Sequence, residues 1–149
     1  MKQSRIIYLL LLLAVMVACN KDNGTNNFEP EVVYQLQSVS DPGILGKVTI
    51  TENSNGSSTL LLELNGTSTD IHPAYIYHNS LAQGGPIAIT LNPIDCDCEF
   101  STTVITALDT GKAISFEELL AFNGHIKVHL NSNSIETVLL QGNIGANAD

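Results

Sequence analysis

The sequence predicts an all-β domain, an antiparallel Greek-key β-sandwich of about eight strands with one short helix. Three observations predict it. Short runs rich in Val, Ile, Leu and Thr recur along residues 31–145, and turn signals of Gly, Pro, Asn and Asp separate them. No long stretch has apolar residues at the spacing of an amphipathic helix. Short strands at this spacing are typical of sandwiches and barrels.

The turn signals set the order of the predicted elements. Asp41-Pro42-Gly43 predicts a turn, and Asn55-Gly56 predicts a tight hairpin. Ser115 and Glu118 have the spacing of a capping box ahead of a Leu pair, which predicts a short helix over 115–120. The runs expected as strands are residues 32–39, 45–53, 58–65, 74–78, 86–91, 100–108, 125–131 and 137–144.

The first thirty residues differ in composition from this domain. Lys2 and Arg5 precede an uncharged run over residues 6–18, which has the length of a secretory signal and is too short to span a membrane. Met16-Val17-Ala18-Cys19 resembles the lipobox of bacterial lipoproteins, which implies cleavage before Cys19 and attachment of lipid to its thiol. We therefore expect a lipoprotein signal peptide over 1–18, a flexible tether over 19–30, the β domain over 31–145 and a C-terminal tail over 146–149.

This N-terminus predicts a location and a first partner. The expected location is the bacterial cell envelope, with the membrane as partner through the Cys19 lipid. Asn20-Lys21-Asp22 faintly resembles a sorting signal and favours the outer membrane or cell surface over the inner membrane. Loss of Lys2 and Arg5 takes the net charge from −9 to −11. Because nucleic acids require clustered cations, no nucleic-acid partner is expected.

The polar and titratable residues of the sequence do not predict an enzyme. No Ser, His and Asp stand at the spacing of a nucleophilic triad, so we expect no catalytic residue and no cofactor. His125 and His129 lie four apart on one strand side and flank Lys127, whose charge opposes a metal ion. We interpret that side as polar and solvent-facing. The alternative is a metal site drawn from His72, His78, His125 and His129.

Two cysteines remain beside the lipidated one. Outside the cytoplasm Cys96 and Cys98 tend to oxidise, and their spacing predicts a strained disulfide rather than two free thiols. They lie within Asp95–Glu99, which alternates carboxylates and thiols. An exposed acidic loop is the prediction there, and a metal-binding loop is the alternative.

The order of several short motifs resembles the CHRD domain, a module named after chordin. Gly85-Pro86 and the apolar run after it, the helical turn over Phe116–Leu120, Val128-His129 and Gln141-Gly142-Asn143-Ile144 follow that family's order. The resemblance implies a sandwich of the immunoglobulin or superoxide-dismutase type.

The departures from that family concern its metal ligands. Tyr75-Ile76-Tyr77 stands where the family has His-Ile-His, and Leu140 stands where it has Arg. Only His129 is carried over by position. The resemblance therefore implies the fold and argues against a metalloenzyme.

Three functions follow as expectations. The first is a non-catalytic binding or structural module with an unknown protein or glycan ligand. The second is a metal-binding protein like the copper/zinc dismutases. The third is a glycan-binding lipoprotein that stacks sugars on Tyr34, Tyr75 and Tyr77.

Overall fold

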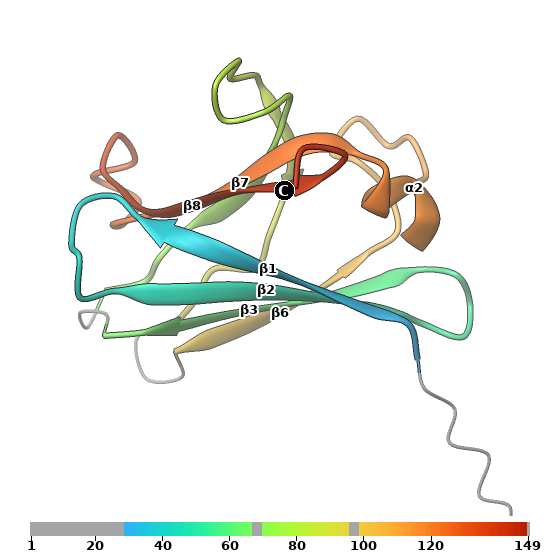
Figure 1. Ribbon diagram of the computed structural model, residues 1–149, viewed down its shortest axis with the longest axis horizontal. Helices are drawn as coiled ribbons and strands as arrows, with labels where there is room; N and C mark the ends of the chain where they lie inside the picture. Colours follow the sequence, from blue (N-terminus) through green and yellow to red (C-terminus); the bar gives the residue numbers. More distant parts are fainter. Residues whose placement is uncertain (1–28, 67–69, 96–98, 149) are drawn as a thin grey trace, which may run out of the picture.

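The computed structural model describes residues 29–66, 70–95 and 99–148, which form a curled antiparallel sheet and one short helix (Figure 1). The predicted signal peptide, Cys19 and the Cys96–Cys98 pair lie outside the described residues. Within the described ranges, no helix has the length and apolar character needed to cross a membrane. The elements are β1 (Glu31–Ser38), β2 (Leu45–Glu52), β3 (Ser58–Asn65), β4 (Ala74–His78), β5 (Ile87–Thr90), β6 (Phe100–Ile105), α2 (Phe116–Leu120), β7 (Asn123–His129) and β8 (Val138–Gly145).

The eight strands lie in the order β5-β4-β7-β8-β1-β2-β3-β6, and each pairs antiparallel with its neighbours. The pairs β3–β6 and β4–β7 join strands three apart in sequence, as in the returning connection of a Greek key. Strand β1 belongs to both halves: Glu31–Leu36 pair with β2, whereas Gln37 and Ser38 pair with β8. The predicted all-β antiparallel fold is confirmed, and its two layers are halves of one sheet.

The core lies between the two halves and follows the two-residue period of the strands. In β3, Leu60, Leu62 and Leu64 are at most 1% exposed, while Leu61 and Glu63 between them face outward. Successive side chains of a strand point to opposite faces, so one apolar set fills the interior. Burial of each such leucine stabilises the fold by about 2 kcal/mol.

The hairpin between β2 and β3 has the predicted Asn-Gly turn. The Asn55 side-chain oxygen accepts hydrogen bonds from the Ser57 amide (3.0 Å) and hydroxyl (2.7 Å). Gly56 has a φ of +79°, in the region where a side chain is disfavoured. The Phe116 amide donates to the Gly56 carbonyl (3.2 Å), so the hairpin also holds the start of α2.

Helix α2 begins with the predicted capping box. The Glu118 amide donates to the Ser115 hydroxyl (3.2 Å), and the Ser115 amide donates to the Glu118 carboxylate (2.9 Å). Phe116 and Leu119 are buried and join the core. The short helix therefore covers one end of the space between the two halves (Figure 1).

The outermost strands, β5 and β6, are tied together by side chains. The Asp109 carboxylate accepts hydrogen bonds from the Thr90 amide (3.0 Å) and hydroxyl (2.7 Å). The Asn92 side chain donates to the Thr102 carbonyl (2.7 Å). Sheet edges otherwise present unpaired backbone groups to other chains. These bonds close the curled sheet on that side.

Candidate functional site

Strands β4 and β7 bring together several of the residues that the sequence singled out. Their register places Tyr75 opposite Lys127 and Tyr77 opposite His125. These side chains lie on the outer side of the sheet, because Ile76 and its neighbours on β7 fill the core. We call Tyr75, Tyr77, His125, Lys127 and His129 the Tyr–His cluster.

The members of the Tyr–His cluster contact one another closely. The Tyr77 ring stacks on His125, with centroids 5.1 Å apart and planes 10° apart, and the Lys127 ammonium lies 5.5 Å from the Tyr77 ring centre. The Tyr77 hydroxyl lies 3.0 Å from Nε2 of His129. Tyr75 meets Tyr77 and His129 edge-on, at 6.1 and 5.7 Å between centroids. The ring faces and the Tyr77 hydroxyl thus contact other members of the cluster.

The two histidines of the cluster are buried. His125 is 1% exposed and His129 is 4% exposed, so the interpretation of this strand side as solvent-facing is wrong. The segment after β4 turns back beside His125: Asn79 has a φ of +65°, and its carbonyl lies 2.7 Å from Nδ1 of His125. The Leu81 amide donates to the Asn143 side chain (2.8 Å) and fastens that segment to β8. Alternation indicates which side a residue faces, but not which loop covers that side.

Burial controls the charge of the cluster. It lowers the pKa of His125 and of His129, and the nearby Lys127 lowers both further, against the opposing effect of the Asn79 and Ile135 backbones and, for His129, of Glu136. Burial also raises the pKa of Tyr77. At neutral pH the imidazoles are therefore uncharged and Tyr77 keeps its proton. We assign that proton to the hydrogen bond with Nε2 of His129.

The other two histidines lie apart from the cluster. His72 is fully buried, with Nδ1 2.7 Å from the Leu130 carbonyl and no hydrogen bond to Nε2. His78 packs on the Phe122 ring, 5.3 Å between centroids. Across the residues that the structure describes, no group of three or more His, Cys, Asp or Glu side chains could hold a metal ion. The four histidines of the metal alternative do not converge.

The outward side of β1, β2, β3 and β6 forms a second surface, which we call the open face. Its register gives cross-strand rows, one of them Val33, Thr49, Leu61 and Thr102. Four apolar side chains are widely exposed there: Val33 (47%), Leu45 (64%), Phe100 (51%) and Val104 (61%). They are four of the eight large apolar side chains exposed among the described residues.

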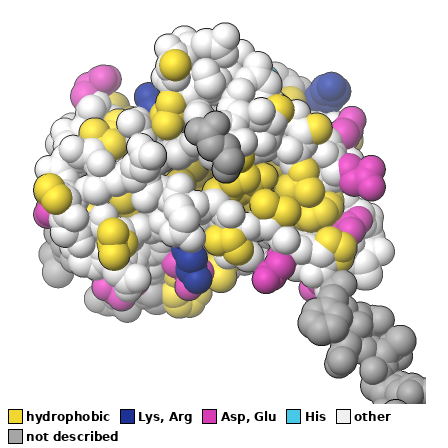
Figure 2. Space-filling view, viewed as in Figure 1, with side chains coloured by type: hydrophobic (Ala, Val, Ile, Leu, Met, Phe, Trp, Pro, Cys, Tyr) yellow, Lys and Arg dark blue, Asp and Glu magenta, His cyan; other side chains and the backbone are white. Residues whose placement is uncertain are grey.

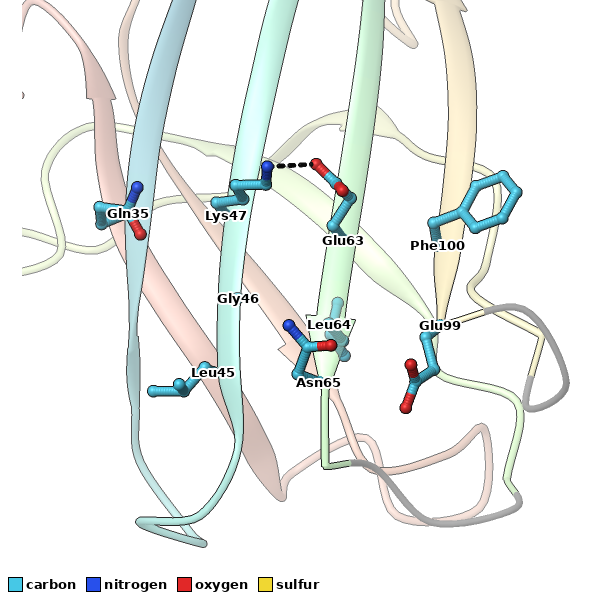
Figure 3. A pocket seen from close by; sticks show the side chains of 9 residues that line it. All are labelled: Gln35, Leu45, Gly46, Lys47, Glu63, Leu64, Asn65, Glu99 and Phe100. Carbon is cyan, nitrogen blue, oxygen red and sulfur yellow. Dashed lines mark ion pairs between the residues drawn. The ribbon is translucent and has the colours of Figure 1, made fainter.

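A hollow of about 410 Å³ lies at one end of the open face (Figure 3). The Lys47 ammonium and the Glu63 carboxylate turn toward each other across it and form an ion pair of 3.0 Å. Leu45 and Phe100 stand on opposite sides of the hollow, and Glu99 lies at its end. The hollow therefore combines one ion pair and the further carboxylate of Glu99 with apolar side chains on two sides.

A third feature lies where β1 separates from β8. Their pairing stops at Gln37, and beyond it a hollow of about 380 Å³ opens between the strands. Figure 2 shows hydrophobic side chains gathered in that opening. Tyr34 and Leu81, which line it, are half-buried, and Val33 is its widely exposed apolar residue. Val33 therefore borders both this opening and the open face.

Sequence reasoning missed the open face. The signal for it was present, because Val33, Leu61 and Val104 occupy positions that alternation assigns to the outer side. An outward apolar residue is ordinary when single. Only the register of four strands shows that these three share one side of the sheet, with Thr49 between Val33 and Leu61.

Comparisons with known proteins gave no match to a family model, a curated protein or a solved structure. The resemblance to the CHRD domain therefore stays a prediction from the order of short motifs.

Proposed function

We propose that the chain is a lipid-anchored, non-catalytic binding module of the bacterial cell envelope, which contacts a protein partner through the open face. The observation that carries the proposal is the gathering of Val33, Leu45, Phe100 and Val104 on one side of the sheet. Thr49, Lys47 and Glu63 lie between them. Exposed apolar surface set among polar residues marks interaction sites on soluble domains.

The Tyr–His cluster, unlike the open face, has its side chains buried or bonded to one another, and this favours the open face as the binding surface. Its histidines are buried, and the Tyr77 hydroxyl is hydrogen-bonded to His129 within the cluster. The same contacts disfavour a glycan ligand there, because His125 and Lys127 occupy the surroundings of the Tyr77 ring. Tyr34 packs against the core and is separate from the other two tyrosines. An apolar protein surface fits the open face better than a sugar fits the tyrosines.

The anchor is the second part of the proposal. It rests on the order of a basic start, an uncharged run and Cys19 in the sequence. Several acyl chains on one residue give stable membrane attachment, since each buried methylene contributes about 0.8 kcal/mol. We expect labelled palmitate to enter the chain and to be lost in Cys19→Ala. Label that persists in this variant contradicts lipid attachment at Cys19.

The chordin-type resemblance belongs to the same proposal. Eight antiparallel strands are compatible with that family's sandwich. The tyrosines at positions 75 and 77 distinguish this chain from a metal-binding member.

The open face is tested by photocrosslinking of the full chain in cells that make it. A photoreactive amino acid at Val104 (61% exposed) probes the face, and the same amino acid at Ile71 (54% exposed) is the matched control. We expect protein adducts from position 104 and none from position 71. Absence of adducts at 104, or equal adducts at both positions, contradicts the proposed binding face.

A further inference from the structure

Strand β1 leaves one edge uncovered where it separates from β8. We propose that an extended peptide segment of a partner protein adds to this edge as a further strand, with apolar side chains toward the core and a Lys or Arg beside Glu31. The edge adjoins the open face at Val33. The inference does not depend on the proposed function of that face, because it concerns the backbone of β1 rather than the outward side chains.

The backbone groups of β1 point alternately toward β2 and toward β8. The Glu52 amide donates to the Pro30 carbonyl (2.9 Å), which places the even-numbered residues of β1 on the β2 side. The Val39 amide donates to the Leu139 carbonyl (2.8 Å), which places the odd-numbered residues on the β8 side. The pairing with β2 runs without a shift in register. The amides and carbonyls of residues 31, 33 and 35 therefore face the opening between β1 and β8.

Strand β8 turns away before it can pair with the start of β1. Gly142 still packs closely, since a Cβ there would lie 3.1 Å from the Gln35 carbonyl. Beyond it, Gly145 has a φ of +60°, and the Ala146 amide donates to the Phe122 carbonyl (3.0 Å). The hollow of about 380 Å³ lies between the separating strands.

Glu31 and Val33 consequently keep unpaired backbone groups. Across residues 29–66, 70–95 and 99–148, no hydrogen bond reaches their amides or carbonyls from the β8 side. The outer edges of β5 and β6 differ, because Asp109 and Asn92 bridge them. Unpaired donors and acceptors along an edge are what an added strand binds, and antiparallel addition gives two hydrogen bonds at each such residue.

The surroundings of this edge select the side chains of the peptide. Alternate side chains of an added strand lie beside Val32 and Tyr34, which are half-buried and share one side of β1 with the buried Leu36. Figure 2 shows hydrophobic side chains in the same opening. The intervening side chains lie beside Glu31 and Val33. Because none of the described residues that line the hollow is Lys or Arg, a cation of the peptide pairs with Glu31 without a competitor.

Peptide display supplies the probe for this edge. Random peptides of about ten residues, the length of a long strand, are selected on the purified full chain in detergent. Their affinities are then measured by fluorescence anisotropy. We expect enriched peptides in which apolar residues alternate and a Lys or Arg recurs near one end. A selection that enriches no peptide, or only peptides without alternation, overturns the inference.

Methylation of the peptide backbone tests the added strand directly. An N-methyl group removes one donor, and only every second amide of an added strand faces β1. Methylation of one alternate set of amides should lower the affinity at least about tenfold, and methylation of the other set should change it less than about threefold. Equal effects of the two sets overturn the inference. Because the protein is unaltered in this comparison, no folding defect can produce the difference.

Variants of the full chain locate the site. Val33→Pro removes the unpaired amide and keeps the bonds to β2, as proline does on edge strands, and Val33→Ala is the matched control that keeps the amide. The affinity should fall at least about tenfold in Val33→Pro relative to Val33→Ala. Glu31→Gln should lower it about three- to fivefold, whereas Glu63→Gln on the open face should leave it unchanged. If Val33→Pro does not fold, Glu31→Gln and the methylated peptides still decide.

Other occupants give different results. Affinity that falls in Val104→Lys but not in Glu31→Gln places the peptide on the open face, which overturns the edge site and keeps the proposed function. A dimer in light scattering that the peptide converts to a monomer shows a second copy at the edge, and this overturns the partner protein. Unchanged affinity in every variant also overturns the inference. Loss of the position 104 adducts, with peptide binding at the edge intact, contradicts only the proposed function.

Discussion

The two outer surfaces of the curled sheet use their residues in opposite ways. On β4 and β7, the tyrosines and histidines have the residue types of an active site, yet they stack, hydrogen-bond and bury one another. On β1, β2 and β6, the residues Val33, Leu45, Phe100 and Val104 are of ordinary strand types, yet they are left exposed. Exposure to solvent, rather than residue type, therefore separates a structural cluster from a binding surface. Variants on the two surfaces should therefore affect different measurements.

The largest effect is expected at His125. His125→Ala removes a ring that is 1% exposed, its stack on Tyr77 and its hydrogen bond to Asn79. The free energy of unfolding should fall by about 2–4 kcal/mol, measured by urea denaturation. Thr102→Ala on the open face is the control and should change it by less than about 0.5 kcal/mol. Equal losses in both variants would remove the distinction between the surfaces.

Acid should weaken the fold through the same cluster. The pKa values of folded His125 and His129 lie below the ordinary value of about 6.5. As the pH falls, the unfolded chain therefore binds more protons than the folded chain does. This part of the stability is present above about pH 6.5 and is lost as the pH falls through the folded values.

Unfolding measured in urea from pH 8 to pH 5 should show that loss. In Lys127→Met the loss should be smaller, because the neighbouring positive charge no longer opposes protonation. A double variant, His125→Gln with His129→Gln, should show a flatter profile. A profile as steep as that of the unaltered chain would place the titration elsewhere.

The Tyr77 hydroxyl tests a single bond of the cluster. Tyr77→Phe keeps the ring but removes the 3.0 Å contact between the Tyr77 hydroxyl and Nε2 of His129. A buried acceptor without a partner should cost about 1–2 kcal/mol, read as a lower thermal midpoint. Tyr75→Phe is the matched control, since no hydrogen bond of the cluster depends on its hydroxyl. A larger loss in Tyr75→Phe would contradict the assigned role.

The smallest effect on stability is expected on the open face. Lys47→Met removes an ion pair whose partners are 46% and 36% exposed. Such pairs contribute little, so the free energy of unfolding should change by less than about 1 kcal/mol in urea denaturation. A loss above that limit would show that the pair holds the sheet together.

Much of the fold was predictable, because its signals are local. Alternation and turn residues gave the bounds of β3 and β4 to the residue, and the capping box placed α2. The merging of two layers into one sheet was not predictable, because it depends on the few residues where β1 changes partner from β2 to β8.

The candidate site was also predictable only in part. Alternation placed His125, Lys127 and His129 on one side of β7, and that placement is confirmed. The burial of both histidines was missed, because it depends on segments outside the strand, at Asn79 beside His125 and at Ile135 and Glu136 beside His129. The predictions for Cys19, Cys96 and Cys98 fall outside the described residues and stay predictions.

The most direct measurement is hydroxyl-radical footprinting of the full chain in native membranes and as a dilute purified protein. Phe100 reports on the open face and Tyr75 reports on the Tyr–His cluster. The account predicts that Phe100 is oxidised less in membranes than in dilute solution, while Tyr75 is oxidised equally in both. Protection of Tyr75 with no change at Phe100 would contradict it.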